Sequence, residues 1–208
     1  MNVLAIGAHF DDVEIGCGGT IARHLANGDK VFVYVVTNSE YTDHDGRMIR
    51  DRATALREGR AAAEILNYEL ICGDFDTWGV SFNHELIEAI NIVIDDYKID
   101  RIYTHWDYDV HQDHQAIGKA TLAAGRRINN LLMYRSNLYM HTNDFRANYF
   151  VDITDYLDLK MKGICAHENE VTKFGPAWLD FWKTEARNNG QRVGVQYAEA
   201  FHLVKFIW

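Results

Sequence analysis

The feature that most constrains this chain is residues 3–20, where a short apolar run leads directly into charged side chains. The run at residues 3–6 is aliphatic and ends at Gly7, a pattern that predicts a buried strand. The polar cluster that follows consists of His9, Asp11, Asp12 and Glu14. Because buried charges are normally paired or coordinate a metal, the sequence predicts a metal site here. Its place would be the carboxyl end of the first strand, where open α/β sheets hold their chemistry.

Strand and helix patterns alternate through at least the first 135 residues. The predicted strands cover residues 3–6, 30–37, 69–72, 101–104, 131–135, 148–153 and 200–206. The predicted helices cover residues 18–28, 50–66, 84–97, 115–127, 154–167 and 178–187, with a turn at 188–190. This order predicts an α/β fold, a single-domain Rossmann-like protein with a mostly parallel sheet and helices on both faces.

Composition restricts the classes of partner. A net charge of −9 over 208 residues disfavours nucleic acid or an anionic membrane as the main partner, but still allows an anionic small molecule. No apolar run approaches the roughly 18 residues of a membrane span, and the N-terminus lacks the features of a signal peptide. The cysteines number three and lie far apart, so they do not make a disulfide framework. We therefore expect a cytoplasmic protein.

A second polar cluster, residues 105–114, directly follows the predicted strand at 101–104. The carboxyl ends of parallel strands share one edge of a sheet, so the two clusters can meet. The candidate side chains of the second cluster are His111, Asp113 and His114. Two imidazoles and a carboxylate with an open position form the usual catalytic zinc arrangement. Zinc lowers the pKa of bound water to about 7, and Asp11, beside Asp12, is placed to take the proton.

These residues also have purely structural interpretations. A His-x-Asp-Asp cluster alone is equally typical of a helix cap, and the second cluster is what favours the metal site. The glycines at 16–19 could form a phosphate loop, but the preceding acids would repel a pyrophosphate, so we expect no dinucleotide cofactor. Trp106, beside the second cluster, fits stacking on a sugar and core burial equally. Core burial is favoured for Trp78, Trp178 and Trp182.

Several segments resemble the signatures of a known family. Residues 9–14, His-Phe-Asp-Asp-Val-Glu, look like AHPDDE, and residues 111–114, His-Gln-Asp-His, look like HPDH. Residues 190–201 resemble a late G-x-x-x-G-x-x-YAEAF segment, and residues 52–66 resemble an R-x-x-x-x-x-E helix. Together they resemble the PIG-L/LmbE-type zinc-dependent N-acetylglucosamine deacetylases along most of the chain. The departures touch no proposed ligand; they are Phe10, Val13 and Gln112.

The resemblance implies a metal centre and a base. The zinc ligands would be His9, Asp12 and His114. Asp11 would be the general base that activates water, and Asp113 would orient a neighbouring imidazole.

It also implies residues that act on the substrate. His111 would help stabilise the oxyanion or protonate the leaving amine, and Tyr197 would lie near the oxyanion. Arg52 would contact the substrate, although pairing with an acid on its helix face is an equal alternative. Trp106 is the second candidate contact.

The function expected from the resemblance is Zn²⁺-dependent hydrolysis of an N-acetyl group from an amino sugar, or from its glycoconjugate or nucleotide derivative. The alternatives are a zinc amidase for a non-sugar N-acyl group and a metal-free sugar- or nucleotide-binding module, which would not need Asp11. Iron also suits these ligands. Residues 1–135 would form the Rossmann-like core and residues 136–208 a substrate-side elaboration. The aromatic-rich segment 201–208 is consistent with a homo-oligomer interface, and loops 38–48 and 138–146 receive no role.

Overall fold

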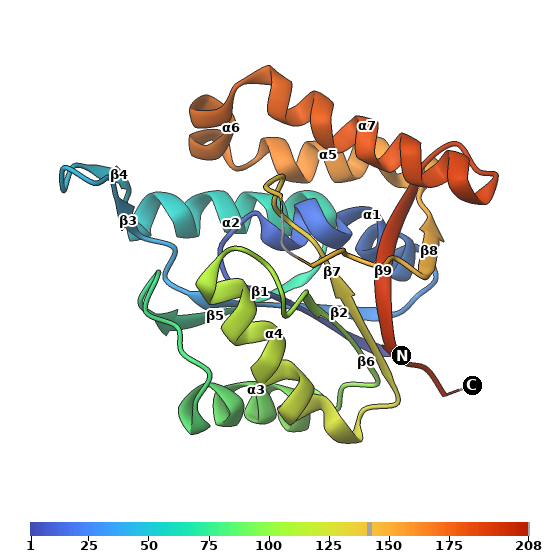
Figure 1. The fold of residues 1–208 in the computed structure, drawn as a ribbon, viewed down its shortest axis with the longest axis horizontal. Helices are drawn as coiled ribbons and strands as arrows, with labels where there is room; N and C mark the ends of the chain where they lie inside the picture. Colours follow the sequence, from blue (N-terminus) through green and yellow to red (C-terminus); the bar gives the residue numbers. More distant parts are fainter. Residues whose placement is uncertain (141–142, 208) are drawn as a thin grey trace.

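The computed structural model describes residues 1–140 and 143–207, and a seven-stranded sheet forms its centre (Figure 1). The strand order is β5-β2-β1-β6-β7-β9-β8. The strands are β1 (Asn2–Gly7), β2 (Lys30–Thr37), β5 (Glu69–Phe75), β6 (Arg101–His105), β7 (Asn130–Tyr134), β8 (Tyr149–Asp152) and β9 (Ala198–Lys205). The first five of these are parallel, whereas β9 runs antiparallel to β7 and β8. The predicted α/β fold with a mostly parallel sheet is confirmed.

Helices cover both faces of the sheet. α3 and α4 lie on one face and α1 and α2 on the other, where α5, α6 and α7 add a further layer (Figure 1). The helices are α1 (Asp12–Ala26), α2 (Arg52–Leu66), α3 (His84–Asp96), α4 (Gln112–Ala124), α5 (Leu157–Cys165), α6 (Glu168–Phe174) and α7 (Pro176–Val193), with 3₁₀ turns at Gly125–Arg127 and Thr154–Tyr156. In β1, Leu4 and Ile6 enter the core against α3 and α4, while Val3 and Ala5 enter the core against α1 and α2. This double burial explains why the strand is apolar throughout.

α1 begins earlier than the sequence predicted, at Asp12 rather than near residue 18. Its backbone leaves the helical conformation at Cys17, with φ −149° and ψ 20°, so two helical segments meet at a kink. The N–H groups of Gly19 and Thr20 at the start of the second segment donate to the Glu199 carboxylate at 2.9 and 2.7 Å. The predicted helix is therefore the second segment, and the first segment carries Asp12.

Further along the chain, the predicted turn at 188–190 is wrong because α7 continues to Val193. Gly190 resembles a turn residue locally, but it serves close packing, since a Cβ there would lie 2.7 Å from the backbone of Gln196 and Tyr197. α6 was not predicted, nor was the hairpin of β3 (Tyr41–Thr42) and β4 (Met48–Arg50) near the expected loop. Residues 141–142 of the unassigned segment 138–146 and residue 208 of the expected interface segment lie outside the described residues.

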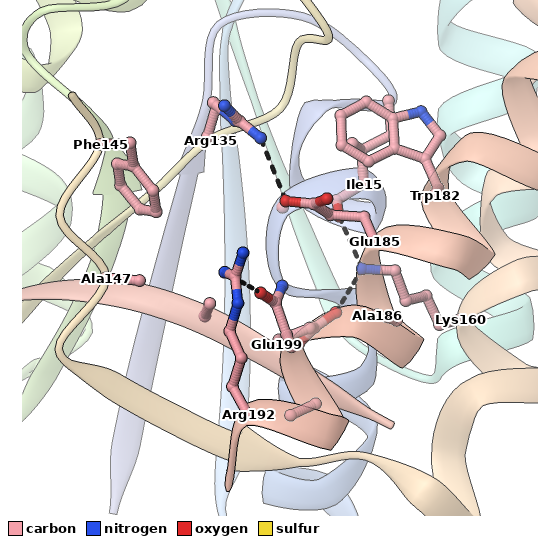
Figure 2. Close-up of a pocket in the computed structure, with 14 residues that line it drawn as sticks. Ile15, Arg135, Phe145, Ala147, Lys160, Trp182, Glu185, Ala186, Arg192 and Glu199 are labelled. Carbon is pink, nitrogen blue, oxygen red and sulfur yellow. Dashed lines mark hydrogen bonds and ion pairs between the residues drawn. The ribbon is translucent and has the colours of Figure 1, made fainter. Parts of the chain in front are cut away.

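Glu199 also holds a buried lysine, in a polar cavity between α1, α7 and β9 (Figure 2). Lys160 Nζ donates to Glu199 Oε1 at 2.5 Å and to Ile15 O at 2.6 Å, and both charged side chains are buried. Breaking a buried ion pair leaves an uncompensated charge, so we expect Glu199→Gln to lower the free energy of unfolding by about 3 kcal/mol. Urea unfolding followed by circular dichroism measures this change.

The matched control for this variant is Glu64→Gln, at an exposed position of α2. It removes the same charge from the surface and should change the free energy of unfolding by less than about 0.5 kcal/mol. Equal stability of the two variants would contradict the assigned role of Glu199.

Candidate metal centre

Two strand ends bring the first and second polar clusters together at the carboxyl edge of the sheet. His9 and Asp12 lie at the junction of β1 and α1, and His114 lies in the first turn of α4, just after β6. The backbone N–H of His9 donates to Asp12 Oδ2 at 2.8 Å, which turns this carboxylate toward the imidazoles. The tight junction therefore presents a ring and a carboxylate from residues only three positions apart.

The geometry of these three side chains fits a metal ion. Asp12 Oδ2 lies 3.3 Å from His9 Nδ1, and Asp12 Oδ1 lies 3.3 Å from His114 Nε2. One ligand atom from each residue lies within 4.8 Å of the others. Asp12 is 4% exposed and faces imidazoles, so its buried charge is compensated either by protonated rings or by a bound metal ion. Two imidazole nitrogens and one carboxylate oxygen suit Zn²⁺.

Carboxylates stand behind both imidazoles. Asp113 Oδ2 lies 3.1 Å from His9 Nε2, and Asp109 Oδ2 lies 3.4 Å from His114 Nδ1. Such partners fix the ring orientation of metal-binding histidines. Burial lowers the pKa of His9, but Asp113 and Asp12 outweigh it and the pKa is raised to about 9. Burial also lowers the pKa of His114, but Asp12 and Asp109 outweigh it and the pKa is raised to about 10. Both rings therefore carry an extra proton at neutral pH when no metal is bound, and metal binding would displace these protons.

Three further residues complete this arrangement and were not predicted from the sequence: His105, Asp109 and Ser136. Ser136 Oγ donates to Asp12 Oδ1 at 2.8 Å, from the chain directly after β7. His105 stacks on His114 at 3.9 Å, and its Nε2 accepts from the N–H of Ala8 at 2.9 Å. Asp109 and His105 lie inside the second cluster, so their residue types were a usable signal. Ser136 carries no signal beyond its place after a strand.

Asp11 has the properties of a base. It is half-buried and adopts φ 122°, a conformation that is unusual for a residue other than glycine. Burial and the neighbouring charges of Asp12 and Glu170 raise its pKa to about 7. A carboxylate with such a pKa is well matched to proton transfer near neutral pH.

His111 is oriented by the first turn of α4. Its Nδ1 accepts from the N–H of Asp113 at 3.2 Å, which leaves Nε2 as the protonated nitrogen of the neutral ring. Burial and the charges of His9 and His114 lower its pKa to about 4. The ring lies 4.8 Å from that of His9, so it stands next to the proposed metal ligands.

A cavity of about 210 Å³ opens beside these side chains. The prediction of core burial is wrong for Trp78, which is 51% exposed on the cavity wall. The backbone N–H of Trp78 donates to Asp113 Oδ2 at 2.7 Å. Trp178 is buried as predicted but also lines the cavity. The aromatic part of the wall consists of Tyr41, Trp78, Tyr139, Phe174 and Trp178.

The structure does not bring three of the predicted residues to this cavity. Arg52 is exposed and pairs at 2.7 Å with Asp74 of β5, so its partner is an acid but not one on its own helix face. Trp106 is 5% exposed in the core against α3 and α4, where its ring lies 5.5 Å from that of Phe145. Tyr197 packs against Ile153, Leu157 and Ala186 instead.

The arginine that does line the cavity is Arg50, which is 2% exposed. Its guanidinium donates to Phe10 O at 3.1 Å and pairs with Glu58 and Glu170 at 3.4 and 3.5 Å. Phe10, a departure from the family signature, packs on α2 at Gly59, where a Cβ would lie 2.1 Å from the Phe10 ring. The changed signature is therefore accommodated by a matching glycine.

The sheet and the site define an α/β protein with a two-histidine, one-carboxylate centre at its carboxyl edge. The family model described as "PIG-L: GlcNAc-PI de-N-acetylase" matches residues 4–125. The chain belongs to this family, so it is a deacetylase-family enzyme, a hydrolase acting on amide bonds, and the family is metal-dependent. No helix within residues 1–140 and 143–207 is long and apolar enough to cross a membrane.

Similar proteins carry related names. The chain is 36% identical to an uncharacterized deacetylase, YaiS, of Escherichia coli over 141 residues, covering 64% of this chain and 73% of that protein. It is 29% identical to diacetylchitobiose deacetylase of Thermococcus kodakarensis, covering 99% of this chain and 84% of that protein.

Solved structures share the fold. A conserved protein from Thermus thermophilus matches with a TM-score of 0.85 and 22% identity, covering 99% of this chain and 95% of that one. N,N'-diacetylchitobiose deacetylase from Pyrococcus horikoshii matches with a TM-score of 0.82 and 22% identity, covering 98% and 83%.

Proposed function

We propose that this enzyme uses Zn²⁺ to hydrolyse the acetamide group of an N-acetylated amino sugar or of a derivative of one. The observation that carries the proposal is the convergence of His9, Asp12 and His114 beside Asp11 in one cavity. When bound there, Zn²⁺ supplies a Lewis acid for the amide carbonyl and acidifies water for attack.

The residues of the chain divide the remaining chemistry. Asp11 accepts the proton of the attacking water, and its raised pKa suits that transfer at neutral pH. Asp11 then delivers this proton to the departing amine nitrogen, so the C–N bond breaks to release acetate and a free amine. Neutral His111 donates a hydrogen bond from Nε2–H to the oxyanion. Asp113 and Asp109 keep His9 and His114 in their ligand orientations.

The cavity wall supports a sugar substrate. Trp78 and Tyr41, whose ring centroids lie 6.0 Å apart, offer aromatic faces for the apolar side of a sugar ring. Leu138, Tyr139 and Trp178 come from residues 136–208, which supports the proposal that this part of the chain forms the substrate side. Relatives named as diacetylchitobiose deacetylases point to the same substrate class.

The test is release of acetate by protein stripped of metal and then given Zn²⁺. We expect release from N-acetylglucosamine glycosides after zinc is restored and none from the stripped protein. N-acetyl amino acids serve as the control substrates. Release from the amino acids alone would contradict the sugar substrate, and release by the stripped protein would contradict the metal centre.

A further inference from the structure

A separate cavity of about 350 Å³ lies between the second half of α1 and strands β6 and β8, and we call it the α1–β8 cavity. Thr20 and Arg23 line it from α1, and Arg101 lines it from the first position of β6. It shares no lining residue with the cavity beside Asp12. Its volume is in the range that small-molecule sites occupy.

Two buried polar atoms of this cavity's lining residues have no hydrogen-bond partner among the described residues. They are Thr20 Oγ1, on a residue that is 1% exposed, and Arg101 Nε. Native proteins leave few buried polar atoms unpaired, so each one calls for a bound water, ion or ligand. An arginine Nε–H can only donate, and a threonine hydroxyl can donate as well, so the missing partner is an acceptor.

The charges of the cavity also favour an acceptor that is negative. Arg23 and Arg101 are both cationic, and Arg101 is held by a cation–π contact, with its guanidinium 5.8 Å from the Phe206 ring centroid. The acid of the lining set is Asp152, whose Oδ1 accepts from the N–H and hydroxyl of Thr154 at 2.9 and 2.7 Å. Its single negative charge offsets one of the two arginines, so the lining keeps a net charge of +1. A positive cavity in a chain of net charge −9 is a local feature and does not follow from the overall composition.

His24 adds no charge to this wall. Its Nδ1 lies 2.7 Å from Asp29 Oδ2 and its Nε2 lies 3.0 Å from the Tyr103 hydroxyl. Burial lowers the pKa of His24, which keeps the ring neutral at pH 7. The positive charge therefore comes from the two arginines.

We propose that the α1–β8 cavity binds a small oxyanion, the phosphate or carboxylate group of a small molecule, with Arg101 Nε and Thr20 Oγ1 as donors. Arg23 donates to Asp152 O through Nη1 at 2.6 Å and keeps further N–H groups that can close over the ligand. The site is independent of the deacetylase chemistry.

The experiment is an NMR titration of the zinc-loaded protein with inorganic phosphate and, separately, with acetate, at constant ionic strength. The Val151 amide resonance is the readout, because Val151 lines this cavity and neither the cavity beside Asp12 nor the one beside Glu199. We expect a saturable shift that Arg101→Gln weakens by about tenfold or more, since a hydrogen bond from a charged donor is lost. Thr20→Val, which removes the hydroxyl at nearly constant volume, should weaken it by several-fold.

Arg60→Gln is the matched control, because Arg60 is exposed on α2 outside this cavity and its replacement changes the net charge equally. Saturation by phosphate alone identifies a phosphate site, and saturation by acetate alone identifies a carboxylate site. Absence of saturation with both anions, or equal weakening by Arg101→Gln and Arg60→Gln, would overturn the proposal. If Arg101→Gln does not fold, Thr20→Val decides, and an unchanged affinity in that variant overturns it.

Discussion

His114→Ala is expected to abolish metal binding: zinc content after dialysis should fall from about one equivalent per chain to near zero. Asp12 loses its contact with His114 Nε2 at 3.3 Å, and the ligand set is reduced to His9 and Asp12. His105 does not replace the missing ligand, because its Nε2 already accepts from the N–H of Ala8 at 2.9 Å. Elemental analysis measures the content, and thermal unfolding with and without added zinc measures the linked stabilisation.

The control for this variant is His44→Ala, since the side chain of His44 is 89% exposed. It should bind zinc as the parent protein does. A second set of donors, His9, His111 and Asp113, also lies within 4.8 Å of one another. If His114→Ala kept a full equivalent of zinc and His111→Ala lost it, the second set would be the metal site. That result would contradict our ligand assignment.

The parts of the fold that the sequence predicted are those encoded by local pattern. β1 and β2 are apolar on both faces, and the two polar clusters follow β1 and β6 directly, so the shared edge of a parallel sheet brings them together. The division of Asp11 and Asp12 into base and ligand rested on their positions and on the family resemblance, and it stays a prediction. Local pattern therefore indicated where the chemistry lies in the fold.

What the sequence did not predict depends on contacts between distant segments. Ser136 reaches Asp12 from 124 positions away, because β7 lies beside β6 in the sheet. Glu199 caps the second segment of α1 from 180 positions away, so no local signal marks the kink. Trp78 lines the cavity and is 51% exposed, because its position depends on the packing of distant segments and not on the average preference of an indole for burial.

Tyr197 illustrates the limit of a motif. Its surrounding segment matches a late signature of the family, and the neighbouring Glu199 has a clear structural role in capping α1. The tyrosine itself packs in the cluster of Ile153 and Leu157, away from the cavity. A matching residue type therefore predicts a shared fold at that position more securely than a shared contact with the substrate.

Asp11→Asn is expected to lower kcat for acetate release by about 10²–10⁴-fold while the bound zinc stays at about one equivalent. The amide keeps the size of the carboxylate and tolerates the positive φ of 122° at this position. It cannot accept the proton of the attacking water. Because the proposed ligands are His9, Asp12 and His114, the metal centre remains intact. Steady-state kinetics and elemental analysis of the same preparation separate these two effects.

Asp74→Asn is the matched control. It removes the same charge as Asp11→Asn, but at a surface residue that forms an ion pair with Arg52. It should keep both the activity and the metal, and its activity also tests whether the exposed pair contributes to turnover. Undiminished acetate release by Asp11→Asn would remove Asp11 as the base. Loss of zinc in Asp11→Asn would instead make Asp11 part of the metal centre, because a base outside the ligand set should not affect metal content.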